Sequence, residues 1–396
     1  MSHGNVFMIV HSYCPADPRV RREAEALAAE GFGVDVFCLR DAGERLVQRI
    51  GGVRYVRFPL RRRRGGVLRY AFEYLALLAA GAMAAVFLHG VKRYRVVQAH
   101  NMPDFLVFCG LIPWLTGVPI VLDLHDPIPE LYMSKFGLDR KSSLIRWLAR
   151  VEGLSVRFAD HAFAATGAFR DRLVERGRPP TKISVLLNSP DPRLFAPRTR
   201  NGNAPPRPRI LFHGTVTHRS GIDCAIRAAE RVRAAGLDFE FVILGDGDFL
   251  PEVRRLAAEG DRPQWIDVRG PVPLERVPEE IAAADLGLVP NRGGAFSDLA
   301  LPTRVFEYLS MERPVIVSRS PAITDLFAEQ DLLFFSPGDE EELARVVERA
   351  LRDPEARAAC VAAGRRVSEQ HRWELERRVY VDVIEALASG RRAMSR

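Results

Sequence analysis

Residues 283–318, AADLGLVPNRGGAFSDLALPTRVFEYLSMERPVIVS, contain the pattern that decides the predicted fold. Two apolar runs, at 286–290 and 315–318, predict buried strands, and a helix is expected between them at about 303–311. Pro302 suits the start of this helix because the N–H that proline lacks would be unpaired there in any case. A buried strand, a polar loop, a helix and a second buried strand indicate a parallel α/β sheet.

The start of this predicted helix is suited to bind an anion. Free N–H groups and the positive end of the helix dipole attract negative charge there, and Arg304 in the first turn adds a full positive charge. Glu307 lies about one turn after Thr303 and therefore points the same way. An anion site beside a carboxylate suits a nucleotide or a phosphorylated sugar, because the carboxylate can accept hydrogen bonds from ribose hydroxyls. The alternative is an ordinary α/β segment in which this Arg and this Glu are solvated.

The segment LPTRVFEYLSMERPVIVS, residues 301–318, resembles the donor site of the family 4 glycosyltransferases, which are retaining enzymes with the GT-B fold. Members often have L-P-T-K-x-x-E-Y here, so Arg304 stands where a Lys is usual, and Glu307 matches the Glu that binds the ribose. The family often has a second Glu eight residues earlier. That position is Leu299 in this chain, and Asp298 before it is a candidate substitute. The resemblance also places the first residues of the motif in the donor site: Leu301, Pro302 and Thr303.

Length and composition fit a two-domain α/β protein. The chain has 396 residues, of which 47% are apolar and 27% charged. The net charge of +7 and the pI of about 9.4 favour anionic partners, without choosing between phosphates, membrane surfaces and nucleic acid. No nucleic-acid recognition motif is found, so nucleic acid is not expected as a partner.

Several site classes find no support in the sequence. The five Cys are far apart and never form C-x-x-C, so neither a disulfide framework nor a zinc site is indicated, and a reducing cytoplasm is expected. An apolar strand begins almost at once, from Val6, without the pattern of a signal peptide. The G-x-G-x-x-G pattern is absent, so a dinucleotide cofactor is not indicated.

The first 40 residues predict a β-α-β unit. A strand at 5–10 is followed by the loop HSYCPADPR, a helix, and a second strand from Val34. Ligands of open α/β sheets bind at the carboxyl ends of the strands, where this loop is expected. The resemblance implies that the loop faces the reacting sugar, so Asp17 and Arg19 are candidates for the acceptor side. A helix N-cap is the alternative role for Asp17.

Residues 61–90 contain the cluster RRRRGG and then the apolar run YLALLAAGAMAAVFLHG. We expect a crossover helix packed on the sheet as part of the core. A second interpretation, which can coexist with the first, is a helix that faces a membrane, with the Arg cluster at 61–64 next to anionic head groups. A transmembrane span, which needs about 20 apolar residues, is disfavoured because the run is slightly short.

Polar side chains follow two further predicted strands. His100 and Asn101 end one strand, and His125 and Asp126 end the next. LHDPIPELY, residues 124–132, is similar to the H-D-x-x-P-E-L-Y segment of family 4, which implies that His125 lies beside the transferred sugar. The resemblance also makes Asp126 a catalytic candidate, and His100 and Asn101 are acceptor-side candidates. A lone His is more often structural, and Glu130 is a weaker candidate that could instead brace the next helix.

The second domain is predicted to begin at residue 209, after a linker at 191–208 that is rich in Pro, Asn, Gly and Arg. RILFHG predicts a strand that leads into a phosphate-binding loop. Members of family 4 usually have an Arg directly after Gly214, where this chain has Thr215. Arg219 is the best match for a second basic residue, with His218 as a further candidate. The resemblance places a later turn beside the nucleotide base: Gly245, Asp246 and Gly247.

The sequence thus predicts an α/β protein of the GT-B class, with two Rossmann-like doubly wound parallel-sheet domains that face each other across a cleft. The first is expected at 1–190, joined by a last helix at about 373–396, and the second at 209–372. The resemblance implies retaining transfer of a sugar from a nucleotide-diphosphate donor to a glycan or a lipid-linked or surface-polysaccharide precursor, at the inner face of the membrane. No D-x-D metal motif stands out, so no metal is expected, and Arg219 and Arg304 would stabilise the leaving diphosphate. The alternatives are a nucleotide-sugar 2-epimerase and a non-catalytic binding protein.

Overall fold

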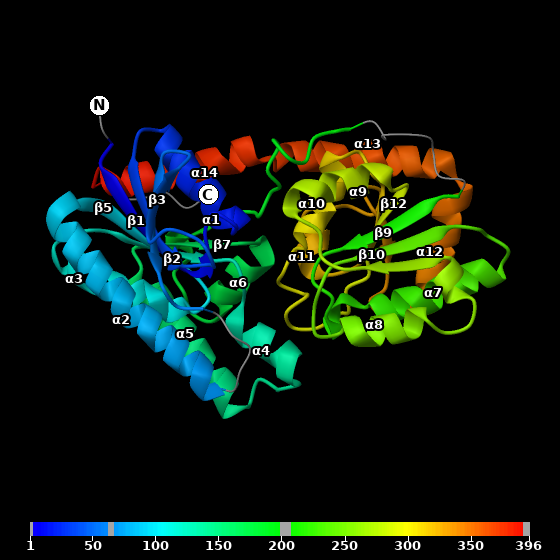
Figure 1. Cartoon of the computed structure of the whole chain (residues 1–396), viewed down its shortest axis with the longest axis horizontal. Coiled ribbons are helices and arrows are strands. Elements are labelled where there is room, and N and C mark those ends of the chain that lie inside the picture. The colour runs from blue at the N-terminus through cyan, green and yellow to red at the C-terminus, as the bar shows by residue number, and fades with distance from the viewer. Residues whose placement is uncertain (1–2, 62–66, 199–206, 391–396) are drawn as a thin grey trace. The chain divides into compact units, whose positions relative to one another are not determined.

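The computed structural model describes residues 3–61, 67–198 and 207–390. The chain divides into two compact units, Met1–Asn188 with Glu374–Arg396, and Ser189–Trp373. Each unit has a sheet that is wholly or mainly parallel, with helices packed against it (Figure 1). The predicted linker at 191–208 falls at the start of the second unit, and its residues 199–206 lie outside the described part of the chain.

The first unit contains an eight-stranded sheet in the order β3-β4-β2-β1-β5-β6-β7-β8. β3 pairs antiparallel with β4, and the other neighbouring strands that the structure describes pair in parallel. β3 was not predicted from the sequence. The strands are β1 (Asn5–Tyr13), β2 (Gly33–Leu39), β3 (Val47–Ile50), β4 (Val53–Phe58), β5 (Tyr94–His100), β6 (Ile120–Leu124), β7 (His161–Ala164) and β8 (Ile183–Val185).

Helices cover this sheet, and the last helix of the chain is among them. Tyr380 on that helix donates a hydrogen bond to Gln98 of β5 at 2.7 Å, and its ring lies 5.5 Å from the ring of Phe163 in β7. The helical segments are α1 (Pro18–Ala29), α2 (Val67–Lys92), η1 (Asp104–Gly110), α3 (Leu111–Leu115), α4 (Ile128–Phe136), α5 (Ser143–Phe158), α6 (Gly167–Glu175), η2 (Pro180–Lys182) and α14 (Trp373–Ala388).

The crossover helix predicted in the apolar run is α2, which connects β4 to β5. It packs closely at Gly81, where an added Cβ would lie 2.2 Å from Ile9 Cδ1. The interpretation of α2 as a plain core helix is wrong, because only 17% of its most apolar window is buried. Of the Arg cluster at 61–64, residues 62–64 lie outside the described residues.

The second unit contains a six-stranded parallel sheet in the order β11-β10-β9-β12-β13-β14. Numbered within the unit, this order is 3-2-1-4-5-6, which is the order of the doubly wound nucleotide-binding fold. The strands are β9 (Arg209–His213), β10 (Glu240–Leu244), β11 (Ile266–Arg269), β12 (Leu286–Val289), β13 (Val315–Ser318) and β14 (Leu333–Phe335).

The core of the second unit is apolar, with Phe212, Phe241 and Trp265 among its buried side chains. The helices pack around it: η3 (His218–Ser220), α7 (Ile222–Ala234), α8 (Leu250–Ala257), η4 (Arg262–Gln264), η5 (Leu274–Arg276), α9 (Val277–Ala283), α10 (Thr303–Ser310), α11 (Pro321–Thr324), α12 (Glu340–Arg352) and α13 (Pro354–Gln370). β9 lies between β10 and β12, so successive strands are added on one side of β9 and then on its other side. Open α/β sheets bind ligands at this reversal, outside the carboxyl ends of the strands.

Candidate active site

Three loops of the second unit are joined at the carboxyl edge of its sheet. The N–H of Gly214 donates to Leu244 O at 3.0 Å, and the N–H of Val216 donates to Asp246 O at 3.0 Å, so the loops after β9 and β10 lie against each other. The N–H of Arg292 donates to Arg219 O at 2.8 Å, which ties in the loop after β12. The backbone therefore brings the predicted phosphate-binding loop, the predicted base-binding turn and the polar loop of residues 291–300 to one place.

Close backbone packing requires glycine at two positions of the predicted base-binding turn. A Cβ on Gly245, which has a φ of +145°, would lie 1.8 Å from Gly214 O, and a Cβ on Gly247 would lie 2.0 Å from Val216 O. Asp246 between them is exposed, as are Gly214 and Thr215. The contact of this turn with a nucleotide base stays a prediction.

Glu307 lies beside a buried histidine that the sequence analysis did not select. Its Oε2 is 3.4 Å from Nε2 of His213, the last residue of β9. Burial lowers the pKa of His213 to about 3, and the charge of Arg304 contributes in the same direction. His213 is therefore a neutral imidazole near pH 7, so it does not place a positive charge beside the Glu307 carboxylate. The only sequence signal for His213 was its place between an apolar strand and a glycine.

Two guanidinium groups lie near each other at this edge. The Arg304 guanidinium sits 4.5 Å from the centroid of the Phe212 ring and donates to His213 O at 2.8 Å. Arg219 sits 4.6 Å from the centroid of the Phe296 ring. Burial lowers the pKa of Arg304, and the nearby charge of Arg219 also lowers it. Two like charges in a partly desolvated place favour a bound anion, because the anion relieves their repulsion.

The remaining predicted donor-site residues surround the start of α10. Thr303 is its first residue, and Leu301 and Pro302 precede it. Leu299, which stands where family members often have a second Glu, is buried in the core, and Asp298 beside it is half-buried. The outside candidate His218 is exposed. The roles of these residues in ligand binding stay predictions.

In the first unit, Asn101 fixes the loop that carries His125 and Asp126. Its side-chain oxygen accepts hydrogen bonds from the N–H groups of His125 and Asp126, at 3.1 and 3.3 Å. Its side-chain nitrogen donates to Asp126 O at 2.7 Å and to Asp104 Oδ1 at 3.2 Å. Asn101 itself is buried, whereas His125 and Asp126 stay partly exposed. Its geometry is that of a positioning residue, and its predicted contact with an acceptor stays a prediction.

Arg19 and His100 belong to a buried charge network around Asp123. Arg19 donates from Nε and Nη2 to the two Asp123 oxygens, at 2.8 and 2.6 Å, and His100 Nδ1 lies 3.0 Å from Asp123 Oδ2. All three side chains are inside the unit, so in this structure neither Arg19 nor His100 faces solvent where an acceptor would bind. Asp17 is the N-cap of α1 and accepts from the N–H groups of Arg19 and Val20, which is the alternative the sequence left open.

Asp123 also affects the protonation of the partly exposed His125. His125 Nδ1 lies 3.5 Å from Asp123 Oδ2. Burial alone would lower the pKa of His125, but the nearby negative charge of Asp123 outweighs it and raises the pKa above its ordinary value. His125 is therefore more protonated at a given pH than a solvated histidine. Glu130, the weaker candidate nearby, is buried and forms an ion pair with Arg176, which is a bracing role.

The substitution Asp123→Asn should lower the pKa of His125, because the carboxylate that favours the imidazolium is removed. We expect NMR titration of the imidazole carbons to show the wild-type His125 midpoint above 6.5 and the variant midpoint below it. His161, whose pKa burial lowers to about 4, is the internal reference and should not move. A variant that keeps the His161 signal and the wild-type His125 midpoint would contradict this assignment.

The same residues include a group with metal-ligand chemistry. Glu23, His100 and Asp123 each present a ligand atom within 4.8 Å of the others. The Arg19 guanidinium lies among them, with its Nε 3.2 Å from Glu23 Oε1, and already supplies the positive charge. We therefore assign no metal to this group, and the expected absence of a metal stays a prediction.

A cavity of about 990 Å³ lies at the other end of the first sheet. Gly4, Tyr94 and Pro119 in its lining are next to the amino ends of β1, β5 and β6. The candidate residues lie at the carboxyl ends of these strands. The cavity is therefore separate from the candidate active site.

Comparisons with known proteins identify the family. A glycosyl transferase 4-like domain matches residues 16–189, and a domain of the glycosyl transferases group 1 matches residues 207–353. The chain therefore belongs to the glycosyltransferases with the GT-B fold, of the family 4 and group 1 type.

Its relatives include 2-deoxystreptamine glucosyltransferase from Streptomyces kanamyceticus, 26% identical over 89% of this chain and 86% of the relative. The amylovoran biosynthesis glycosyltransferase AmsK from Erwinia amylovora is 26% identical over 56% of this chain, and the match spans 54% of AmsK. Sucrose-phosphate synthase from Thermosynechococcus elongatus has the same fold, with a TM-score of 0.77, 19% identity and coverage of 98% and 100% of the two chains. The HepE structure from Anabaena with UDP and glucose has a TM-score of 0.72, 15% identity and coverage of 97% and 100%.

Proposed function

We propose that this glycosyltransferase moves a sugar, with retention of configuration, from a nucleotide-diphosphate donor to a glycan or lipid-linked acceptor of surface-polysaccharide assembly. The proposal rests on one observation: Arg219, Arg304 and Glu307 lie near one another where the strand order of the second sheet reverses. Relatives named as an amylovoran biosynthesis glycosyltransferase and a putative colanic acid biosynthesis glycosyltransferase support the class of acceptor, and the UDP-glucose complex of HepE supports the class of donor.

In the proposed reaction, the second unit holds the donor and the first unit holds the acceptor. The bond from the sugar C1 to the phosphate oxygen breaks, and a bond to an acceptor hydroxyl oxygen forms on the same face of the sugar. The hydroxyl proton passes to the leaving diphosphate. Arg219, Arg304 and the start of α10 stabilise the diphosphate charge without a metal, and Glu307 orients the ribose. In the first unit, Asn101 and Asp123 hold His125 in place, and the family resemblance implies that His125 acts on the transferred sugar.

A thermal-shift screen against UDP, GDP, ADP and their sugar conjugates tests the donor, because a ligand that binds the native state raises its melting temperature. We expect one nucleotide to stabilise the protein, and its sugar conjugate to be consumed only when an acceptor is added. Formation of an epimer from the donor alone would favour the 2-epimerase. A folded protein that no nucleotide stabilises would favour the non-catalytic alternative.

The substitution Arg219→Met should weaken binding of the nucleoside diphosphate about tenfold or more, because it removes a charge-assisted contact with phosphate. Affinity for the corresponding nucleoside, which has no phosphate, should stay unchanged. Calorimetric titration with both ligands measures the difference. The matched control is Arg254→Met on α8, an exposed position outside these loops. Equal losses for the diphosphate and the nucleoside would contradict a phosphate role for Arg219.

A further inference from the structure

The large apolar side chains that are most exposed gather on the first unit. The described residues of the second unit contribute none to this set. Most of the set lies on three helical segments, and we call these residues the apolar face: Phe72, Leu75, Met83, Val86, Phe87 and Val91 of α2, Leu111, Ile112, Trp114 and Leu115 of α3, and Leu144, Trp147 and Leu154 of α5.

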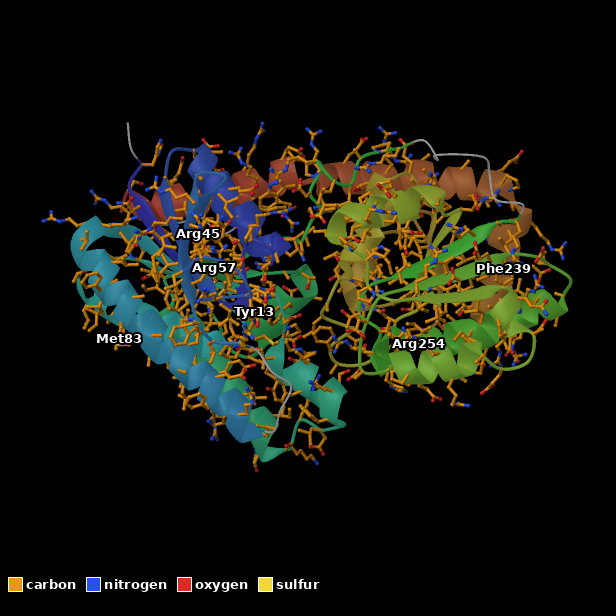
Figure 2. All side chains as sticks on the ribbon, viewed as in Figure 1. Tyr13, Arg45, Arg57, Met83, Phe239 and Arg254 are labelled. Carbon is orange, nitrogen blue, oxygen red and sulfur yellow. The ribbon has the colours of Figure 1, made fainter. Side chains whose placement is uncertain are left out.

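The outer side of α2 is the main part of the apolar face. Positions 72, 75, 79, 83, 86, 87 and 90 are exposed, whereas positions 73, 77, 81 and 85 are buried, so one regular stripe faces outward. That stripe contains only Phe, Leu, Ala, Met, Val and Gly. Met83, labelled in Figure 2, is 68% exposed, and Phe87 is 73% exposed. In a water-facing helix this stripe would be polar, so its composition indicates an apolar environment.

The three segments are neighbours in the first unit. His89 near the end of α2 lies 3.1 Å from the hydroxyl of Thr116, which follows α3. The ring of Trp114 on α3 lies 5.5 Å from the ring of Phe158 at the end of α5. Trp114 and Trp147 are both partly exposed, and tryptophan is enriched where a membrane meets water.

The charges on these helices have one sign at the surface. The exposed charged residues that the structure describes on α2, α3 and α5 are all arginines: Arg69, Arg146, Arg150 and Arg157. The two acidic residues, Glu73 and Glu152, are buried. An apolar face bordered by arginines is complementary to an anionic lipid surface. A second copy of the chain is a poorer fit, because symmetric pairing through this face would bring the arginines of two copies together.

One side of α2 packs against the first unit, which disfavours a membrane span. Gly81 packs on Ile9 of β1, and Cys109 of η1 lies 3.4 Å from Leu78 O with its sulfur as donor. Glu73 is buried near the start of the helix. A span would have to leave these contacts and take a charged side chain into the bilayer, which is costly. The helix is therefore suited to lie along the membrane surface.

We propose that the apolar face inserts into the head-group region of a bilayer that contains anionic phospholipid. This insertion would hold the first unit at the membrane surface. The proposal deepens the proposed function, because it rests on that function for the lipid-linked acceptor that the first unit would receive there. Binding to the membrane itself needs neither donor nor catalysis. The two proposals can therefore fail separately.

Flotation of the full chain with vesicles tests the membrane proposal. We expect binding to vesicles of phosphatidylcholine with phosphatidylglycerol, and weaker binding to phosphatidylcholine alone. The double variant Met83→Glu with Phe87→Glu should lower the partition coefficient about tenfold or more, because two inserted apolar side chains are lost. Val47→Glu on β3, also an exposed apolar residue of the first unit, is the matched control and should bind as the wild type does.

Two further measurements keep the result interpretable. The thermal shift with the stabilising nucleotide should be the same in the double variant and the wild type, which shows that the fold and the donor site are intact. Arg146→Glu with Arg150→Glu should weaken binding to the anionic vesicles only. Wild type that fails to float with either vesicle overturns the proposal, even if nucleotide binds. A wild-type dimer in solution that the double variant converts to a monomer, without vesicle binding, would instead assign the apolar face to a second copy.

Discussion

Glu307→Gln should weaken binding of the donor nucleotide by about ten- to a hundredfold and lower kcat/KM for sugar transfer at least as much. The loss corresponds to about 1.5–3 kcal/mol for hydrogen bonds between ribose hydroxyls and an ionised carboxylate. Glutamine keeps the shape and removes the charge, and neutral His213 beside it leaves no buried imidazolium without its partner. The packing of α10 should therefore survive. Titration calorimetry and initial rates measure the two effects.

The matched control for this prediction is Glu341→Gln on α12, an exposed acidic residue of the same unit. It should bind the nucleotide as the wild type does. A second comparison uses the 2′,3′-dideoxy form of the nucleotide, which lacks the ribose hydroxyls. Wild type and Glu307→Gln should bind that ligand equally well. Undiminished binding of the natural nucleotide by Glu307→Gln would remove Glu307 from the donor site.

Arg19→Met should lower the free energy of unfolding of the first unit by about 3–5 kcal/mol, because it leaves Asp123 buried without its main cationic partner. Burial alone would raise the pKa of Asp123, but Arg19 and the hydrogen bonds around it hold the pKa well below its usual range. In the wild type this depressed pKa contributes stability that is present above the unfolded-state pKa of about 4 and is lost as pH falls. The variant loses that contribution, so the difference from wild type should be fully developed above pH of about 5 and should shrink as pH falls below about 4.

Hydrogen exchange measures this effect unit by unit. Amides of β1, β5 and β6 should exchange faster in Arg19→Met, and amides of the second unit should be unchanged. Arg172→Met is the control, since Arg172 forms an ion pair with exposed Glu175 at 3.0 Å and such pairs contribute less than about 1 kcal/mol. Equal protection of the first unit in Arg19→Met and Arg172→Met would show that the buried network is not stabilising.

The sequence predicted the elements that rest on local signals. The apolar run at 286–290 and the helix after Pro302 were found as β12 and α10, and the two-domain α/β fold is confirmed. It missed β3, whose residues VQRI are mostly exposed and lack the alternation of a half-buried strand. The sequence signal for the hairpin of β3 and β4 was the Gly51-Gly52 turn between them.

Contacts between distant residues were beyond the reach of a single sequence. Arg19 was singled out in the loop after the first strand, but its partner Asp123 is 104 residues away, and no local pattern reports that the pair is buried. The apolar run of α2 shows the same limit, since composition does not reveal whether a helix is covered by the rest of the protein. His213 was missed because a single histidine at a strand end has no distinctive pattern. The sequence therefore placed candidate residues at the correct edges but could not separate exposed groups from the buried groups that hold them.

The packing of α14 has a consequence for the order in which the protein folds during synthesis. Two hydrogen bonds join α14 to much earlier residues. Gln98 accepts from Tyr380, which is 282 residues later, and Glu376 accepts from the N–H of Leu187. The second unit is continuous in sequence, and its residues are synthesised before those of α14 that join the first unit. The first unit, although its strands are synthesised first, needs α14 to complete its packing. The N-terminal half is thus translated first and completed last.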